Sequence, residues 1–231
     1  MAKHHVQGLV EYDGKQGEIV ASGRTEGVLK VAEMSGDNGA FGVGACEGLD
    51  GEITIFEGKA YVSRVRGEGL VMDNDPSAGA IFGAWTKNRR WQDEPVPAEI
   101  HTYYDLQLFV QTRATAAGID TGATPFPFLM TGRPKQIRWH VNVDHTEGMP
   151  LTRDTFRQSK ANYVTEHQEI DIVGFYSELH HGVFIGTYAP AIKDEGAENA
   201  MHIHLLSKDG NLTGHIDDLA FEGGMTLRLP R

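Results

Sequence analysis

The sequence predicts a β-rich α+β protein. Its 28 glycines fall mostly between short strand-like runs, a pattern that favours many turns over a helical bundle. The clearest helical spacing belongs to a single segment, residues 101–117. With 231 residues, of which 40% are hydrophobic and 23% charged, the chain suits one large domain or two closely joined subdomains that bury a sizeable core.

Turn residues and apolar spacing predict the elements of the first half. Short apolar runs over residues 6–20 are interrupted by glycines. Residues 25–34 carry apolar side chains at helical spacing behind a threonine cap, which predicts a short helix. In residues 53–65 apolar and polar side chains alternate on both sides of Glu57-Gly58, and this pattern is typical of a β-hairpin.

The second half begins with the helix over residues 101–117, which ends at Gly118 because glycine favours the C-terminal cap. Predicted strands and an acidic loop follow, the strands over residues 136–143, 170–176 and 183–188 and the loop over residues 190–200. A last strand pair surrounds Asp209-Gly210. We therefore divide the chain into an N-terminal α/β sheet subdomain, residues 1–125, and a C-terminal β-rich metal-binding subdomain, residues 126–231.

Composition excludes several classes of function. The net charge of −11 argues against nucleic acid or an anionic membrane surface as a partner. No apolar run approaches the length of a membrane-spanning helix, and the single cysteine, Cys46, excludes an intramolecular disulfide. The first residues contain no apolar signal segment. We expect a soluble protein, cytoplasmic in preference to secreted.

Residues 201–206 contain two histidines in an alternating apolar and polar run. In a strand, His202 and His204 project from the same face. A two-residue turn at Asp209-Gly210 then places His204 opposite His215.

In the same register His202 lies opposite Asp217, which is a candidate for orienting a ligand ring. Three imidazoles on one patch of a sheet match the ligand set of a catalytic zinc site, which keeps a fourth position for water or substrate. A single strand histidine is more often an ordinary packed residue, but three on one face favour the metal site. The register decides this prediction, because a loop one residue longer or shorter would turn His215 to the other face.

Several motifs, taken in order along the chain, resemble the acetolactate decarboxylase family. A glycine-rich passage over residues 36–48 leads into Leu49-Asp50-Gly51-Glu52, as in that family. The His-x-His motif at residues 202–204, followed after ten residues by Gly214-His215, matches the family's zinc-binding pattern. The segments 172–175 and 227–230 also fit, so that the resemblance covers about three quarters of the chain.

The resemblance implies a fold of two β-sheet regions with few helices, assembled as a homodimer. It also implies a Zn²⁺ ion, or another divalent metal, held by His202, His204 and His215. Glu52 would lie beside the metal and handle a proton. The small-molecule substrate would be acetolactate or a related 2-hydroxy-3-oxo acid.

The sequence departs from the family where the substrate carboxylate is bound. His140 stands at the position of the family's arginine. Arg138, two residues away on the same strand face, is a candidate for the cation, as is a protonated His140. The family extends into a tail with a second glutamate, whereas this sequence ends at Arg231, so we expect no glutamate from a tail.

The chemistry fits these residue types. A divalent metal that chelates the hydroxyl and ketone oxygens acts as a Lewis acid and stabilises the enediolate left by loss of CO2, and Glu52 can then protonate it. The function predicted is a carboxy-lyase that yields an acetoin-type product. The alternatives are another lyase or isomerase reaction on an oxo acid, or a non-catalytic metal-binding or small-molecule-binding protein. A cupin-like iron oxygenase is disfavoured, because residues 205–208 supply no glutamate ligand.

Overall fold

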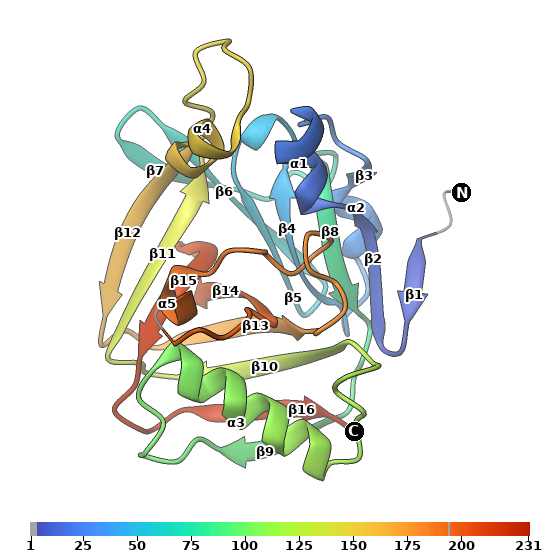
Figure 1. The fold of residues 1–231 in the computed structure, drawn as a ribbon, viewed down its shortest axis with the longest axis vertical. Coiled ribbons are helices and arrows are strands. Elements are labelled where there is room, and N and C mark those ends of the chain that lie inside the picture. Colours follow the sequence, from blue (N-terminus) through green and yellow to red (C-terminus); the bar gives the residue numbers. More distant parts are fainter. Residues whose placement is uncertain (1–3, 194) are drawn as a thin grey trace.

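Two antiparallel β-sheets packed face to face form the body of the protein (Figure 1). The computed structural model describes residues 4–193 and 195–231. Each sheet has eight strands, and the helices are few and short apart from α3 (Tyr103–Ala116). The predicted β-rich α+β class with two sheet regions is therefore confirmed.

The first sheet contains the strands of the N-terminal part of the chain. Their spatial order is β1 (His5–Gln7), β2 (Val10–Gly14), β8 (Gly79–Thr86), β4 (Phe41–Cys46), β5 (Glu52–Phe56), β6 (Lys59–Arg66) and β7 (Gly69–Asp73), and β3 (Leu29–Lys30) also pairs with β8. The short helices in this part are α1 (Gln16–Ser22), α2 (Val31–Met34) and a 3-10 turn, η1 (Glu47–Leu49).

The second sheet contains the remaining strands. Their order is β12 (Lys160–Glu166), β11 (Gln136–Asn142), β15 (Thr213–Ala220), β14 (Met201–Ser207), β13 (Ile170–Tyr176), β10 (Phe126–Gly132), β16 (Thr226–Pro230) and β9 (Trp91–Pro95). Helix α4 (Arg153–Gln158) precedes β12, and α5 (Pro190–Lys193) precedes β14. Strand β9 belongs to this sheet although it precedes residue 125, and the division into two subdomains stays a prediction.

The two faces of the second sheet have different neighbours. On the outer face, Ile203 and Leu205 pack with Leu106 and Val110 of α3, which lies across this sheet in Figure 1. On the inner face, Val173 and Phe175 pack with residues of the first sheet such as Val43 and Ala45. Because side chains alternate along a strand, the even-numbered residues of β14 face the first sheet, and these include His202 and His204.

Several predicted elements are confirmed. The hairpin turns at Glu57-Gly58, where both residues have positive φ and Phe56 pairs with Lys59. Helix α3 begins behind Thr102, whose side chain forms a capping box with Asp105. Strand β13 spans the predicted residues. Within the described part of the chain, no helix combines the length and apolar character needed to span a membrane.

Two predictions were wrong. Of residues 25–34, predicted as a helix, only the last turn is helical, because Val28 and Leu29 instead pair with β8 through Ala80. Residues 183–188, predicted as a strand, instead contain a turn. The Gly182 N–H donates a hydrogen bond to the Ile185 carbonyl oxygen, and Gly182 has φ +72°. The alternation of apolar residues there reflects burial of Phe184 and Ile185 beneath a turn rather than a strand.

Gly174 provides a test of how tightly the second sheet is packed. A Cβ atom at this position of β13 would lie 2.4 Å from Phe128 Cζ, and that ring is fully buried. We expect Gly174→Ala to lower the free energy of unfolding by about 1–3 kcal/mol through overpacking. Gly69→Ala is the control, since the nearest atom lies 3.7 Å away. Chemical denaturation of both variants measures the difference, and equal stabilities would contradict the packing described.

Candidate metal centre and active site

Four histidines lie together on the inner face of the second sheet. His140 of β11 pairs with His215 of β15, which in turn pairs with His204 of β14, and His202 lies two residues further along β14. The chain turns over residues 208–211 rather than over Asp209-Gly210 alone, because the Ser207 N–H donates to the Leu212 carbonyl oxygen and the Gly210 N–H to that of Ser207. The register is the one predicted, so the pairing of His204 with His215 is confirmed. At the adjacent Gly214 a Cβ atom would lie 2.5 Å from the His140 carbonyl oxygen, so only glycine lets β15 approach β11 this closely.

Asp217 does not occupy its predicted position opposite His202. The β14–β15 pairing ends at His204, and a bulge in β15 leaves Asp217 as an extra residue between the partners of Arg138 and Trp139. Its carboxylate accepts a hydrogen bond of 2.6 Å from His140 Nδ1. The aspartate therefore orients His140 and not one of the three predicted metal ligands.

Three ring nitrogens converge at the centre of the site. His202 Nε2 lies 3.1 Å from His204 Nε2 and 3.0 Å from His215 Nδ1. The three residues each offer one atom within 4.8 Å of the others, and together they could hold a metal ion. A tetrahedral zinc ion with Zn–N bonds near 2.05 Å would separate its ligand nitrogens by about 3.3 Å, close to the observed spacing.

Hydrogen bonds on the far side of two rings fix their tautomers. His202 Nδ1 lies 2.5 Å from the Phe184 carbonyl oxygen, which can only accept, so the proton of the neutral ring is on Nδ1. His204 Nδ1 lies 3.0 Å from Thr54 Oγ1. Thr54 is 2.7 Å from Thr213 Oγ1, which is also 2.6 Å from the Leu205 carbonyl oxygen. A proton on His204 Nδ1 satisfies this chain, since Thr213 then donates to the carbonyl.

The consequence is that two unprotonated nitrogens face each other. With both protons on Nδ1, the lone pairs of His202 Nε2 and His204 Nε2 point together across 3.1 Å in a buried site. Such a contact is repulsive unless a cation lies between the nitrogens. The hydrogen bonds of these histidines therefore leave a pair of lone pairs that suits a divalent metal. Phe184 and Thr54 are the outer partners that orient the two ligand rings, as such partners do in metal sites.

Burial keeps the three imidazoles neutral. It lowers the pKa of His202 to about 4, against a weaker opposing effect of its bond to the Phe184 backbone. Burial likewise lowers the pKa of His204 and of His215 well below the ordinary value. Neutral imidazole is the form that binds a metal.

Glu52 approaches the histidines from the opposite sheet. It begins β5, is 2% exposed, and places its carboxyl oxygens 3.6 Å from His204 Nε2 and 3.9 Å from His140 Nε2. Burial raises the pKa of this carboxyl group well above its usual value, although the charge of Lys160 and a hydrogen bond from the Asn142 backbone act in the opposite direction. A raised pKa favours the protonated form of a carboxylic acid, which is the form that can act as a proton donor.

The other two predicted site residues lie in different surroundings. His140 is 4% exposed, and burial lowers its pKa despite the bond to Asp217, so a neutral ring replaces the protonated one considered from sequence. Arg138 is not brought into the site: its side chain is 58% exposed and pairs with Asp218. No motif pointed to Thr54, Asn142 or Lys160, because each reaches the site only through pairing between strands.

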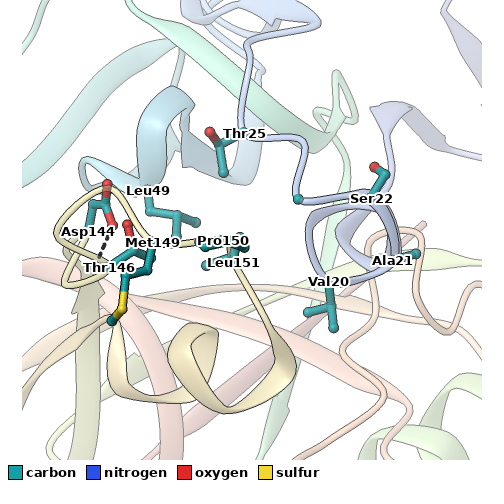
Figure 2. A pocket seen from close by; sticks show the side chains of 11 residues that line it. Val20, Ala21, Ser22, Thr25, Leu49, Asp144, Thr146, Met149, Pro150 and Leu151 are labelled. Atoms are coloured by element: carbon teal, nitrogen blue, oxygen red, sulfur yellow. Dashed lines mark hydrogen bonds between the residues drawn. The ribbon is translucent and has the colours of Figure 1, made fainter.

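A cavity of about 650 Å³ opens onto these residues, and α1 and α4 contribute to its wall. Glu52, His140, His202 and His215 line it, together with Asn142 and three cations, Arg153, Arg157 and Lys160. A second hollow of about 470 Å³ lies beside the end of α1 (Figure 2). One of its walls comes from the segment Val20 to Thr25 and another from residues 144–151. Asp144 is its one ionisable lining residue among those described, so the first cavity is the candidate active site.

The sequence is similar to known proteins along most of its length. The sequence model described as alpha-acetolactate decarboxylase matches residues 16–229. The alpha-acetolactate decarboxylase of Streptococcus thermophilus is 23% identical over 216 residues, covering 86% of this chain and 75% of its own. That of Lactococcus lactis subsp. cremoris is 23% identical over 217 residues, covering 88% and 76%.

Solved structures support the fold. The alpha-acetolactate decarboxylase of Bacillus subtilis strain 168 superposes with a TM-score of 0.72 at 17% identity, over 95% of this chain and 84% of its own. A Staphylococcus aureus protein of unknown function, described as similar to alpha-acetolactate decarboxylase, superposes with a TM-score of 0.68 at 18% identity, with the same coverage.

The hydroxyl of Thr54 is open to a direct test. We expect Thr54→Val to weaken metal binding about 10–100-fold, because His204 loses the partner that fixes its ring and tautomer. Competition with a chelator of known affinity measures the change. Thr86→Val is the control, since this equally buried hydroxyl accepts from the Asn88 backbone rather than contacting a histidine. Equal metal affinity in wild type and Thr54→Val would show that the threonine does not support the ligand.

Proposed function

The chain belongs to the alpha-acetolactate decarboxylase family, a family of carboxy-lyases, and on this premise we propose that it is a zinc-dependent decarboxylase of acetolactate or a related 2-hydroxy-3-oxo acid. The products would be CO2 and an acetoin-type hydroxy ketone. The observation that carries the proposal is the convergence of Glu52 with the three histidines beside one cavity. The homodimer implied by the family stays a prediction.

His202, His204 and His215 would hold the metal through His202 Nε2, His204 Nε2 and His215 Nδ1. When bound, the ion polarises the hydroxyl and ketone oxygens of the substrate and stabilises the negative charge that develops as CO2 leaves. Zinc suits three neutral imidazoles with an open fourth position. The apolar inner face of the first sheet, represented at the cavity by Phe82, keeps bulk water away from the histidines.

Glu52 supplies the proton. Loss of CO2 from the oxo-acid anion leaves an electron pair on carbon, which must take up one proton to give the neutral hydroxy ketone. Burial raises the pKa of the Glu52 carboxyl group, which favours its protonated form, and the group lines the same cavity. After the transfer it is a carboxylate, and one proton from solvent restores it, so each turnover consumes one proton.

His140 positions Glu52. Asp217 accepts from His140 Nδ1, which leaves the unprotonated Nε2 facing Glu52 Oε1 at 3.9 Å. The Asn142 backbone also acts on this carboxyl group, lowering its pKa. Both neighbours belong to β11, so this strand would set the orientation of Glu52 in the cavity.

The metal and the activity are tested together. Wild-type protein loaded with zinc should bind one equivalent and release CO2 and acetoin from acetolactate. His202→Ala removes a ligand at the centre of the cluster and should lose both bound metal and turnover. Elemental analysis and product assay measure the two. Metal retained at wild-type level in His202→Ala would refute this ligand set.

One observation favours a larger analogue as an alternative substrate. The cavity of about 650 Å³ carries Arg153 and Arg157 in addition to Lys160, more positive charge than one carboxylate requires. A 2-hydroxy-3-oxo acid with a second anionic group would use these arginines. Zinc retained without turnover of acetolactate, but with CO2 released from such an acid, would favour this alternative.

A substitution at Glu52 separates proton transfer from metal binding. Glu52→Gln keeps the shape of the side chain but removes the acidic proton, and we expect kcat to fall by about 10²–10⁴-fold with zinc retained. The control is Glu57→Gln, an exposed glutamate at the turn of the same hairpin. Product assay and metal analysis measure both variants. Turnover within a factor of two of wild type in Glu52→Gln would assign the proton to another group.

A further inference from the structure

Lys160 and Asn142 form a pair at the edge of the cavity. They lie directly opposite each other in the β11–β12 ladder, and both line the cavity. Directly opposed side chains in an antiparallel pair have Cβ atoms about 5 Å apart. Asn142 is two residues from His140, so its side chain is on the face that carries the histidines. The pair therefore adjoins the metal centre from the β12 side.

Both members of this pair are available to bind a ligand. The Lys160 side chain is only 23% exposed, and its ammonium has a single carboxylate neighbour among the described residues, Asp217 Oδ1 at 3.8 Å. This separation is longer than a charge-assisted hydrogen bond. Asn142 is 5% exposed, and its Oδ1 has no hydrogen-bond partner in the described part of the chain. A buried amide oxygen without a donor is costly, and a ligand in the cavity would supply one.

The other cations are placed differently. Arg138 faces solvent beside Asp218. Arg157 is 49% exposed, lies 3.8 Å from Asp154 and stacks over the Tyr188 ring at 4.8 Å, so it belongs to the rim. Lys160 is the cation that acts on the centre. Its charge lowers the pKa of Glu52, which favours the carboxylate, and lowers the pKa of three of the four histidines, which favours their neutral form.

We propose that Lys160 and Asn142 recognise the 2-hydroxy acid end of the substrate. Lys160 Nζ donates to the carboxylate that leaves as CO2, and Asn142 Oδ1 accepts from the neighbouring hydroxyl group. The assignment rests on the proposed function for the identity of the substrate. It places the carboxylate at the β12 side of the cavity and the carbon that receives the proton between this pair and Glu52.

The expected effect is on binding more than on the chemical step. Negative charge moves away from the carboxylate as CO2 forms, so Lys160 stabilises the bound substrate at least as much as the transition state. Removal of its charge should therefore raise KM while changing kcat less.

Binding of two small probes tests the assignment independently of turnover. The probes are 2-hydroxyisobutyrate and 2-methylpropane-1,2-diol, which share the hydroxyl group and differ in that a carboxylate replaces a CH2OH group. Isothermal titration of the zinc-loaded protein gives their Kd values. In Lys160→Met we expect the acid to bind about tenfold more weakly or worse, with the diol unchanged, and Lys160→Arg should restore most of the loss. Asn142→Ala should weaken both probes alike. Arg138→Met, the control cation, should change neither.

The outcomes separate this proposal from the proposed function. Unchanged affinity for the acid in Lys160→Met, or equal weakening of acid and diol, would overturn the role given to Lys160. Loss of acid binding in Arg138→Met would assign the carboxylate to that residue instead. If the probes behave as expected but acetolactate yields no CO2, the recognition site stands and the decarboxylase assignment fails.

Discussion

The site depends on one contact between the two sheets, that of Thr54 on β5 with His204 on β14. The hydroxyl lies 3.0 Å from His204 Nδ1 and 2.7 Å from Thr213, so it joins both strands of the histidine hairpin to the first sheet. Because all three residues are fully buried, no water replaces these bonds. The same strand carries Glu52 two residues earlier, on the same face. A shift of β5 by one residue would remove the threonine from the ring and the glutamate from the cavity together.

Packing of the two sheets determines the pKa shifts of the site residues as well as their positions. The inner face of this sandwich is apolar around Val173 and Phe175, and the polar cluster continues that face up to the wall of the cavity. Desolvation acts in opposite directions on the two kinds of group, raising the pKa of Glu52 and lowering that of His202. One environment thus favours the protonated acid and the unprotonated ligands together. Burying so many polar groups costs stability, which the apolar core around α3 offsets.

Features that depend on neighbouring residues could be predicted from the sequence, whereas contacts between distant strands could not. The loop around Asp209-Gly210 is two residues longer than predicted but is centred on the same pair, so the pairing of His204 with His215 followed from counting. Glu52 was reached through the family motif. Asp217 was misplaced because a bulge cannot be counted from one strand. Phe184 was assigned to a strand although its turn presents a carbonyl to His202. Lys160 was missed because its pairing with Asn142 spans a helix and a loop.

The charge of the cavity bears on how a reaction cycle would proceed. The chain carries a net charge of −11, yet Arg153, Arg157 and Lys160 outnumber the single carboxyl group, Glu52, among the residues that line the cavity. An oxo-acid anion is therefore attracted to the cavity although the protein as a whole repels it. On decarboxylation the substrate loses its charge. Among the described residues, the carboxylate within 4 Å of Lys160 is then that of Asp217, at 3.8 Å. Neutral products make no charge-assisted contact with the ammonium, so the interaction that favours substrate binding is absent when the products leave.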